Sequence, residues 1–95
     1  MGSEIARVGI IGAGQMGKGI AQVCAASGFL VDLNDISEQR LAAAVADIES
    51  TLQRQQERGS IAAADRAAAV GRIKTSTSYD AFSNCDIVIE AASEN

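Results

Sequence analysis

The chain has 95 residues, of which 47% are hydrophobic and 21% are charged, a composition typical of one small globular domain. Its formal net charge of −4 argues against a nucleic-acid backbone or an anionic membrane surface as the main partner. The sequence contains no His, which excludes His-based acid–base catalysis and His metal ligands. We therefore assign no catalytic residue and no metal ligand to this chain.

The two cysteines, Cys24 and Cys85, lie too far apart for a CxxC motif. The longest apolar stretch near the start, residues 8–11, is too short for a secretory signal or a membrane span. These features predict a cytoplasmic protein without membrane association. Both thiols are expected to stay reduced and to pack as small buried hydrophobic side chains.

Apolar runs separated by Gly and polar residues predict strands that alternate with helices. The predicted strands cover residues 7–11, 29–34, 73–76 and 86–91. The predicted helices cover residues 16–27, 38–57 and 62–70, and a single turn covers 79–82. The order β-α-β-α-α-β-turn-β is typical of an α/β, Rossmann-like fold with a parallel sheet and right-handed crossovers.

The first predicted helix places Ile20, Val23 and Cys24 on the face expected to be buried, and Gly28 is expected to end it. In the second helix, apolar residues recur every three or four positions. They are Leu41, Val45, Ile48 and Leu52.

Residues of known capping preference mark the ends of the later helices. Ser37 is the expected N-cap of the second helix. Ser60 is the expected N-cap of the third helix, and Gly71 is expected to end it.

A Gly-rich turn joins the first predicted strand to the first predicted helix. It consists of Gly12, Ala13, Gly14, Gln15, Met16 and Gly17. In a β-α-β unit this G-x-G-x-x-G spacing predicts a dinucleotide-binding turn, in which the glycines allow a tight turn, close approach of a pyrophosphate and close helix packing. A Gly-rich turn that binds nothing is the alternative, and the pattern alone leaves FAD open. A phosphate-binding loop of the Gly-Lys-Ser/Thr type is excluded.

Asp35 ends the second predicted strand and can accept hydrogen bonds from both hydroxyls of an adenine ribose. A carboxylate at this point would repel a 2′-phosphate, which favours NAD over NADP. Ile36 offers an apolar surface for the adenine. Asp32, the other carboxylate of the strand, is expected to occupy a partly exposed position without a cofactor role.

Residue 95 follows directly after the last predicted strand, where an open α/β sheet normally continues. We therefore expect residues 1–95 to be the N-terminal portion of a dinucleotide-binding domain, truncated after its fourth strand. The two later helices would form a helical hairpin at about residues 38–70.

Three segments closely resemble the 3-hydroxyacyl-CoA dehydrogenases, a family that includes the 3-hydroxybutyryl-CoA dehydrogenases. Residues 8–23 read V-G-I-I-G-A-G-Q-M-G-K-G-I-A-Q-V, residues 33–37 read L-N-D-I-S, and residues 86–95 read D-I-V-I-E-A-A-S-E-N. The resemblance extends over essentially the whole chain. One departure is Asp32, where the family usually has an apolar residue.

The resemblance implies an NAD-dependent oxidoreductase that interconverts an L-3-hydroxyacyl-CoA, in particular 3-hydroxybutyryl-CoA, and the 3-oxoacyl-CoA by hydride transfer. It implies that the Gly-rich turn holds the diphosphate, that Asp35 binds the ribose and that Glu94 lies beside the cofactor. It also implies that Thr51 and Arg58 contact the coenzyme A of an acyl-CoA substrate. An exposed helix face is the alternative role of these last two residues.

In the family, the catalytic His–Glu pair and a helical C-terminal domain that builds a homodimer lie further along the chain. Neither is present in these 95 residues. An L-gulonate-type or other β-hydroxyacid dehydrogenase remains an alternative parent. A stand-alone nucleotide-binding module without catalytic activity is the alternative from another class of protein.

Overall fold

The computed structural model describes residues 5–92, which form one parallel sheet with helices between its strands. The strands are β1 (Arg7–Ile11), β2 (Leu30–Asn34), β3 (Ile73–Ser76) and β4 (Ile87–Glu90). The helices are α1 (Gln15–Ala26), α2 (Glu38–Glu57), α3 (Ala63–Gly71) and the short 3-10 helix η1 (Asp80–Asn84). The predicted α/β, Rossmann-like fold is confirmed, and predicted and observed element ends differ by two residues at most.

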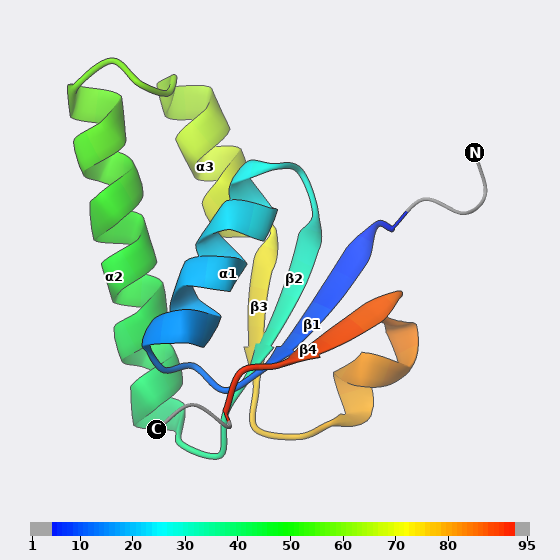
Figure 1. Ribbon diagram of the computed structural model, residues 1–95. Helices are drawn as coiled ribbons and strands as arrows, with labels where there is room; N and C mark the ends of the chain where they lie inside the picture. The colour runs from blue at the N-terminus through cyan, green and yellow to red at the C-terminus, as the bar shows by residue number, and fades with distance from the viewer. Residues whose placement is uncertain (1–4, 93–95) are drawn as a thin grey trace.

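The sheet has the strand order β3-β2-β1-β4, and all three pairings are parallel. The long helices α1, α2 and α3 lie together on one face of this sheet, and η1 lies away from them, beside β1 and β4 (Figure 1). The carboxyl ends of β1 and β2 lie side by side because Ile11 pairs with Asn34. The loops that follow these two strands are therefore neighbours.

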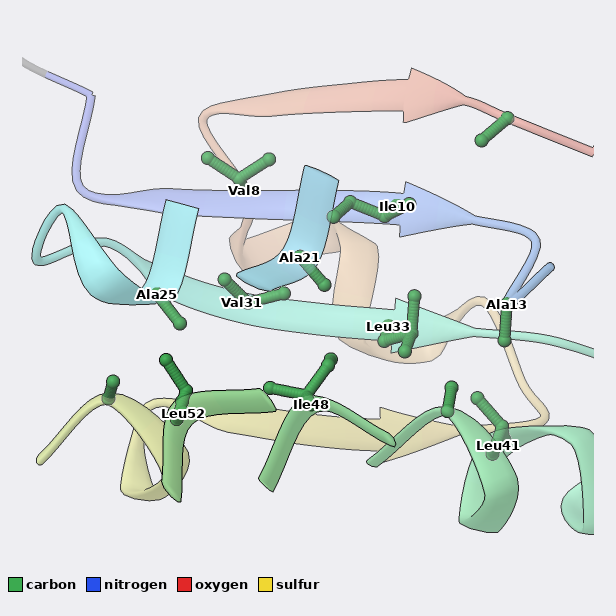
Figure 2. Close-up of a cluster of buried hydrophobic side chains, with 13 residues drawn as sticks. Val8, Ile10, Ala13, Ala21, Ala25, Val31, Leu33, Leu41, Ile48 and Leu52 are labelled. Carbon is green, nitrogen blue, oxygen red and sulfur yellow. The ribbon is translucent and has the colours of Figure 1, made fainter. Parts of the chain in front are cut away.

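The hydrophobic core lies between the sheet and the three helices (Figure 2). Alternate residues of the two central strands point into it, namely Val8, Ile10, Val31 and Leu33. From the opposite side, Ile48 and Leu52 of α2 are each only 1% exposed. The apolar area that this layer removes from water is the main stabilising contribution available to a domain of this size.

The buried face of α1 agrees with the predicted one only in part, since Ile20 and Cys24 are half-buried and pack against the core. Its buried residues are Gly17, Ala21 and Ala25, whereas Val23 is 64% exposed. Only small side chains fit here because α1 lies close to the strands, which turns the larger apolar residues toward the flank of the helix. In α2 a similar change makes Ala44 buried and leaves Val45 half-buried.

Of the four predicted helix ends, three are correct and one is wrong. Gly28 follows α1 with a φ of 102°, and the hydroxyl of Ser37 accepts a hydrogen bond from the Arg40 N–H at the start of α2. Ser60, however, is not the N-cap of α3, because the helix begins later, after Ala62. Gly71 is the last residue of α3, as predicted, and the guanidinium of the next residue, Arg72, donates to the Ala25 carbonyl of α1 at 2.7 Å.

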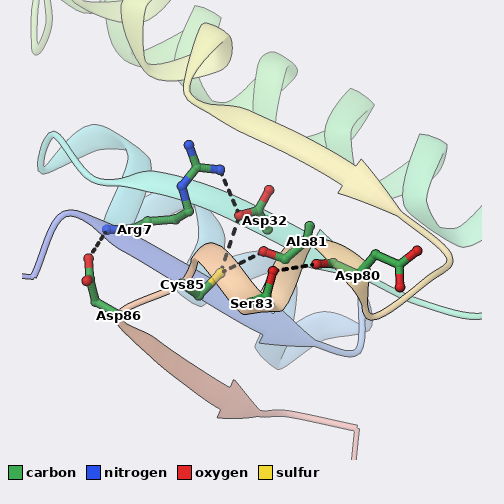
Figure 3. A network of polar contacts seen from close by, with 7 residues as sticks. All are labelled: Arg7, Asp32, Asp80, Ala81, Ser83, Cys85 and Asp86. Atoms are coloured by element: carbon green, nitrogen blue, oxygen red, sulfur yellow. Dashed lines mark hydrogen bonds and ion pairs between the residues drawn. The ribbon is translucent and has the colours of Figure 1, made fainter.

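Asp32 is buried rather than partly exposed, with only 4% of its surface accessible. Its carboxylate accepts hydrogen bonds from the Arg7 guanidinium at 3.2 Å and from the Cys85 thiol at 3.3 Å (Figure 3). The neighbouring strand position is Gly9, and a Cβ there would collide with the ring of Phe82 in η1. The absence of a side chain at Gly9 thus lets η1 approach the sheet and cover Asp32.

The two cysteines are free and half-buried, so neither is the fully buried side chain that the sequence predicts. Burial raises the pKa of the Cys24 thiol. Burial, together with the hydrogen bond to Asp32 and the negative charge of that carboxylate, raises the pKa of Cys85 to about 11. Cys85 is therefore a protonated hydrogen-bond donor at neutral pH and a poor nucleophile.

We expect Asp32→Asn to accelerate alkylation of Cys85, because removing the carboxylate charge lowers the pKa of the thiol and increases its thiolate fraction. Iodoacetamide rates measured between pH 7 and 10 in a Cys24→Ala background would report Cys85 alone. An unchanged pH profile in the folded variant would show that Asp32 does not control this thiol.

Candidate functional site

The Gly-rich turn lies at the carboxyl end of β1, where it passes beneath the residues that follow β4. Gly12 has a φ of 103°, and its N–H donates to the Asn34 carbonyl at 2.7 Å. A Cβ at Gly12 would lie 2.9 Å from the Cα of Ala92. Both the backbone conformation and the crowding therefore require Gly at this position.

Gly17 lies in the first turn of α1, directly against the Gly12 carbonyl. A Cβ at Gly17 would overlap that carbonyl oxygen, so this helix can approach the turn only because Gly17 lacks a side chain. Gly14 is the N-cap of α1 and makes no side-chain capping hydrogen bond, and the first turn contains no acidic residue. The positive end of the helix dipole is thus not neutralised by the side chains of α1 itself, which suits it to a bound anion.

Asp35 links the Gly-rich turn to the start of α2. It is only 6% exposed. One carboxylate oxygen accepts from the Ala13 N–H at 2.9 Å, and the other accepts from the Ser37 N–H at 3.0 Å. Each oxygen retains acceptor capacity for a further hydrogen bond.

The pKa of Asp35 lies below its ordinary value. Burial raises this pKa, but backbone N–H donors, chiefly those of Ala13 and Ser37, together with the positive charge of Arg40 lower it by more. Asp35 is therefore an ionised, immobilised acceptor at neutral pH.

A cavity of about 180 Å³ opens between the ends of β1 and β2 and the start of α2. Its lining residues are Ile11, Gly12, Asn34, Asp35, Ile36, Arg40, Tyr79 and Ala92. Ile36 is 90% exposed, and the ring of Tyr79 stacks on that of Phe82 with 5.6 Å between centroids. A carboxylate between exposed apolar surfaces can hold a ribose by its hydroxyls while an adjoining flat base packs on the apolar groups.

Arg40 and Tyr79 line this cavity although the sequence analysis did not select them. Arg40 follows Asp35 by five positions and lies in the first turn of α2, so inspection of the helix start for charged residues could have found it. Tyr79 comes from the distant segment before η1, and only the fold brings it to the end of β2.

Thr51 and Arg58 lie apart from this cavity. Both lie toward the far end of α2, two helical turns from one another and therefore on a shared face. Thr51 is half-buried and its hydroxyl accepts from the Arg54 guanidinium at 3.3 Å, whereas Arg58 is exposed. Glu94 lies outside the described residues, so its position relative to the cavity stays a prediction.

A larger groove of about 720 Å³ runs between α2 and β3. Polar residues of this groove include Glu38, Glu49 and Thr75. Neither Asp35 nor any residue of the Gly-rich turn lines it. We place the candidate site at the smaller cavity because the fixed carboxylate of Asp35 and Gly12 of the Gly-rich turn line it.

Residues 5–92 contain no cluster of three or more His, Cys, Asp and Glu side chains that could hold a metal ion. Over the same range, no helix is long and apolar enough to cross a membrane.

The sequence pattern of the 3-hydroxyacyl-CoA dehydrogenase NAD binding domain matches residues 7–95. The chain belongs to this family. Its cofactor is accordingly NAD, as the Gly-rich turn and Asp35 predict, and FAD is set aside.

Relatives and solved structures with the same fold agree with this assignment. A 3-hydroxybutyryl-CoA dehydrogenase of Bradyrhizobium diazoefficiens is 44% identical over 99% of this chain and 32% of its own length. The crystal structure of (S)-3-hydroxybutyryl-CoA dehydrogenase from Ralstonia eutropha has a TM-score of 0.92 and 50% identity, covering 97% of this chain and 32% of that one. The crystal structure of 3-hydroxybutyryl-CoA dehydrogenase from Escherichia coli has a TM-score of 0.93 and 38% identity, and the match covers 97% of this chain and 20% of that one. The chain thus spans about a third of the length of the curated relatives that it matches most strongly.

We expect Gly17→Ala to lower the free energy of unfolding by at least about 3 kcal/mol, because the new methyl group would overlap the Gly12 carbonyl. Gly19→Ala in the same helix is the matched control, since a Cβ there meets nothing within 4 Å. It should raise the stability by about 0.5 to 1 kcal/mol through helix propensity. Urea denaturation of both variants measures the difference, and equal stabilities would contradict the predicted overlap.

Proposed function

We propose that this chain is the cofactor-binding part of an oxidoreductase that interconverts L-3-hydroxyacyl-CoA and 3-oxoacyl-CoA, with 3-hydroxybutyryl-CoA as the specific substrate. The single observation that carries the proposal is the immobilised, ionised Asp35 on the wall of a cavity beside the Gly-rich turn. The family assignment and the names of the relatives support the reaction and the substrate class.

Residues of the turn and of β2 would hold the dinucleotide. The backbone of residues 12–17 and the positive end of the α1 dipole would bind the diphosphate, and Asp35 would accept hydrogen bonds from the adenine ribose. Ile36 would cover one side of the adenine. Bound NAD supplies the hydride acceptor, and the residues of this chain orient it. We also propose Glu94 as a neighbour of the cofactor.

Residues 1–95 would form the N-terminal portion of the dinucleotide-binding domain, with α2 and α3 as its helical hairpin. We assign no catalytic residue to this portion, because without a His it has no group of the kind that takes the hydroxyl proton in this family. A homodimer and a cytoplasmic location are part of the same proposal. The greater length of the matched relatives supports the proposal that residues 1–95 are one portion of a longer domain.

Thr51 and Arg58 would bind the coenzyme A moiety of the substrate. The shared face of the two residues on α2 supports this role, since a hydroxyl and an exposed guanidinium two turns apart offer donors to a phosphate. The distance along α2 between this face and Asp35 would separate the nucleotide end of coenzyme A from the adenine end of the cofactor.

Asp35→Ala tests the cofactor site. We expect it to weaken NADH binding by about tenfold or more, because the ribose hydroxyls lose a charged acceptor, and to weaken NADPH binding less. Nicotinamide fluorescence of the purified chain measures both affinities, and circular dichroism on the same samples checks that the helices are formed. Asp47→Ala, an exposed carboxylate on α2, is the matched control. A folded wild-type chain that does not bind NADH would refute the proposal.

Arg58→Ala tests the coenzyme A site. It should weaken binding of acetoacetyl-CoA by about fivefold and leave acetoacetyl-pantetheine, which lacks the nucleotide and its phosphates, unaffected. Calorimetric titration of the chain with each ligand measures the difference. Lys74→Ala, which removes an exposed positive charge from β3, controls for the change in net charge. Equal losses for both ligands would remove Arg58 from the coenzyme A site.

A further inference from the structure

Arg40 is a charged residue of the cavity that the proposed function does not use. It lies in the first turn of α2, where its N–H donates to the Ser37 hydroxyl. Its side chain is 64% exposed, and its guanidinium lies 3.8 Å from the Asp35 carboxylate. Both side chains line the same cavity. The wall that would meet the adenine ribose therefore carries a positive charge beside a negative one.

Asp35 cannot move away from a ligand that carries negative charge at the ribose. Its two oxygens are held by the Ala13 and Ser37 N–H groups, which belong to the turns after β1 and β2. A phosphate on the ribose 2′-oxygen would approach this buried carboxylate directly. Asp35 by itself would thus exclude the phosphorylated dinucleotide. A neighbouring positive charge is needed to offset the repulsion between the carboxylate and the 2′-phosphate.

Arg40 is placed to supply that charge. The 3.8 Å separation from Asp35 is longer than a hydrogen bond, and within residues 5–92 its guanidinium makes no hydrogen bond. The side chain is long and mostly exposed, so its donors can turn toward a phosphate at the cavity mouth. The adjacent acidic residue, Glu38, lines the groove on the flank of α2 that faces β3.

We infer that Arg40 is a specificity-determining residue that admits the 2′-phosphate of NADP(H), so that the chain binds both dinucleotides while preferring NAD. This inference rests on the proposed function, because it places the adenine ribose beside Asp35. A guanidinium offers two parallel N–H donors to a phosphate, which an ammonium group cannot match.

The test is a fluorescence titration of the chain with NADH and with NADPH, which differ only in the 2′-phosphate. We expect Arg40→Gln to raise the ratio of the NADPH to the NADH dissociation constant by about tenfold, with NADH affinity changed by less than about twofold. Arg40→Lys should raise the same ratio of dissociation constants by a smaller factor. The added discrimination should weaken as salt is increased, because an exposed charge contact is screened.

Arg54→Gln is the matched control, since it removes the same charge from an exposed position further along α2. It should leave the ratio unchanged. Equal losses of NADH and NADPH affinity in Arg40→Gln, or an unchanged ratio, would overturn the inference while the cofactor site stands. A wild-type chain that binds NADH but not NADPH would overturn it as well. A folded chain that binds neither dinucleotide would refute the proposed function itself.

Discussion

The contact between the first turn of α1 and the Gly12 carbonyl determines the geometry of the whole carboxyl edge of the sheet. Because Gly17 has no side chain, the helix begins directly against the turn, and its N-terminus points toward the space above β1. The same turn places the Ala13 N–H where it can bind Asp35. One close backbone approach therefore positions both the N-terminus of α1 and the Asp35 carboxylate.

The two faces of the sheet are packed in different ways. On the helical face, Ala21 and Ala25 let α1 lie close to β1 and β2, while longer side chains of α2 fill the space beyond (Figure 2). On the opposite face, Gly9 leaves room for η1, and the polar group Asp32 is satisfied by Arg7 and Cys85 (Figure 3). A buried carboxylate is tolerated there because both a cation and a thiol donate to it.

Sequence patterns correctly predicted the structural features that depend on residues close together in the chain. The strand and helix boundaries follow from apolar runs, from Gly28 and from the Ser37 cap, all of which act within a few residues of themselves. The turn at residues 12–17 was found in the same way, because each glycine answers a local requirement of the strand–helix junction. The placement of Asp35 after β2 follows from the parallel order of the strands.

Features that depend on distant segments were missed. The burial of Asp32 requires η1, whose residues lie about fifty positions later. No sequence pattern near Asp32 predicts that η1 covers it. The prediction for α1 was wrong at Val23, because hydrophobicity favours burial of this residue, whereas the close approach of the helix to the sheet favours burial of Ala. Tyr79 reaches the cavity only through the path of the chain after β3.

The acidic character of the chain is compatible with a dianionic ligand because the donors at the site belong to the backbone. Gly14, the N-cap of α1, has no side chain to oppose an incoming phosphate, and the first turn of α1 contains no acidic residue. In the proposed cofactor complex the charged side chains lie at the adenine ribose, where two backbone N–H groups hold Asp35 and the exposed Arg40 side chain can turn. Diphosphate binding would then be common to both dinucleotides, and the choice between them would depend on Asp35 and Arg40.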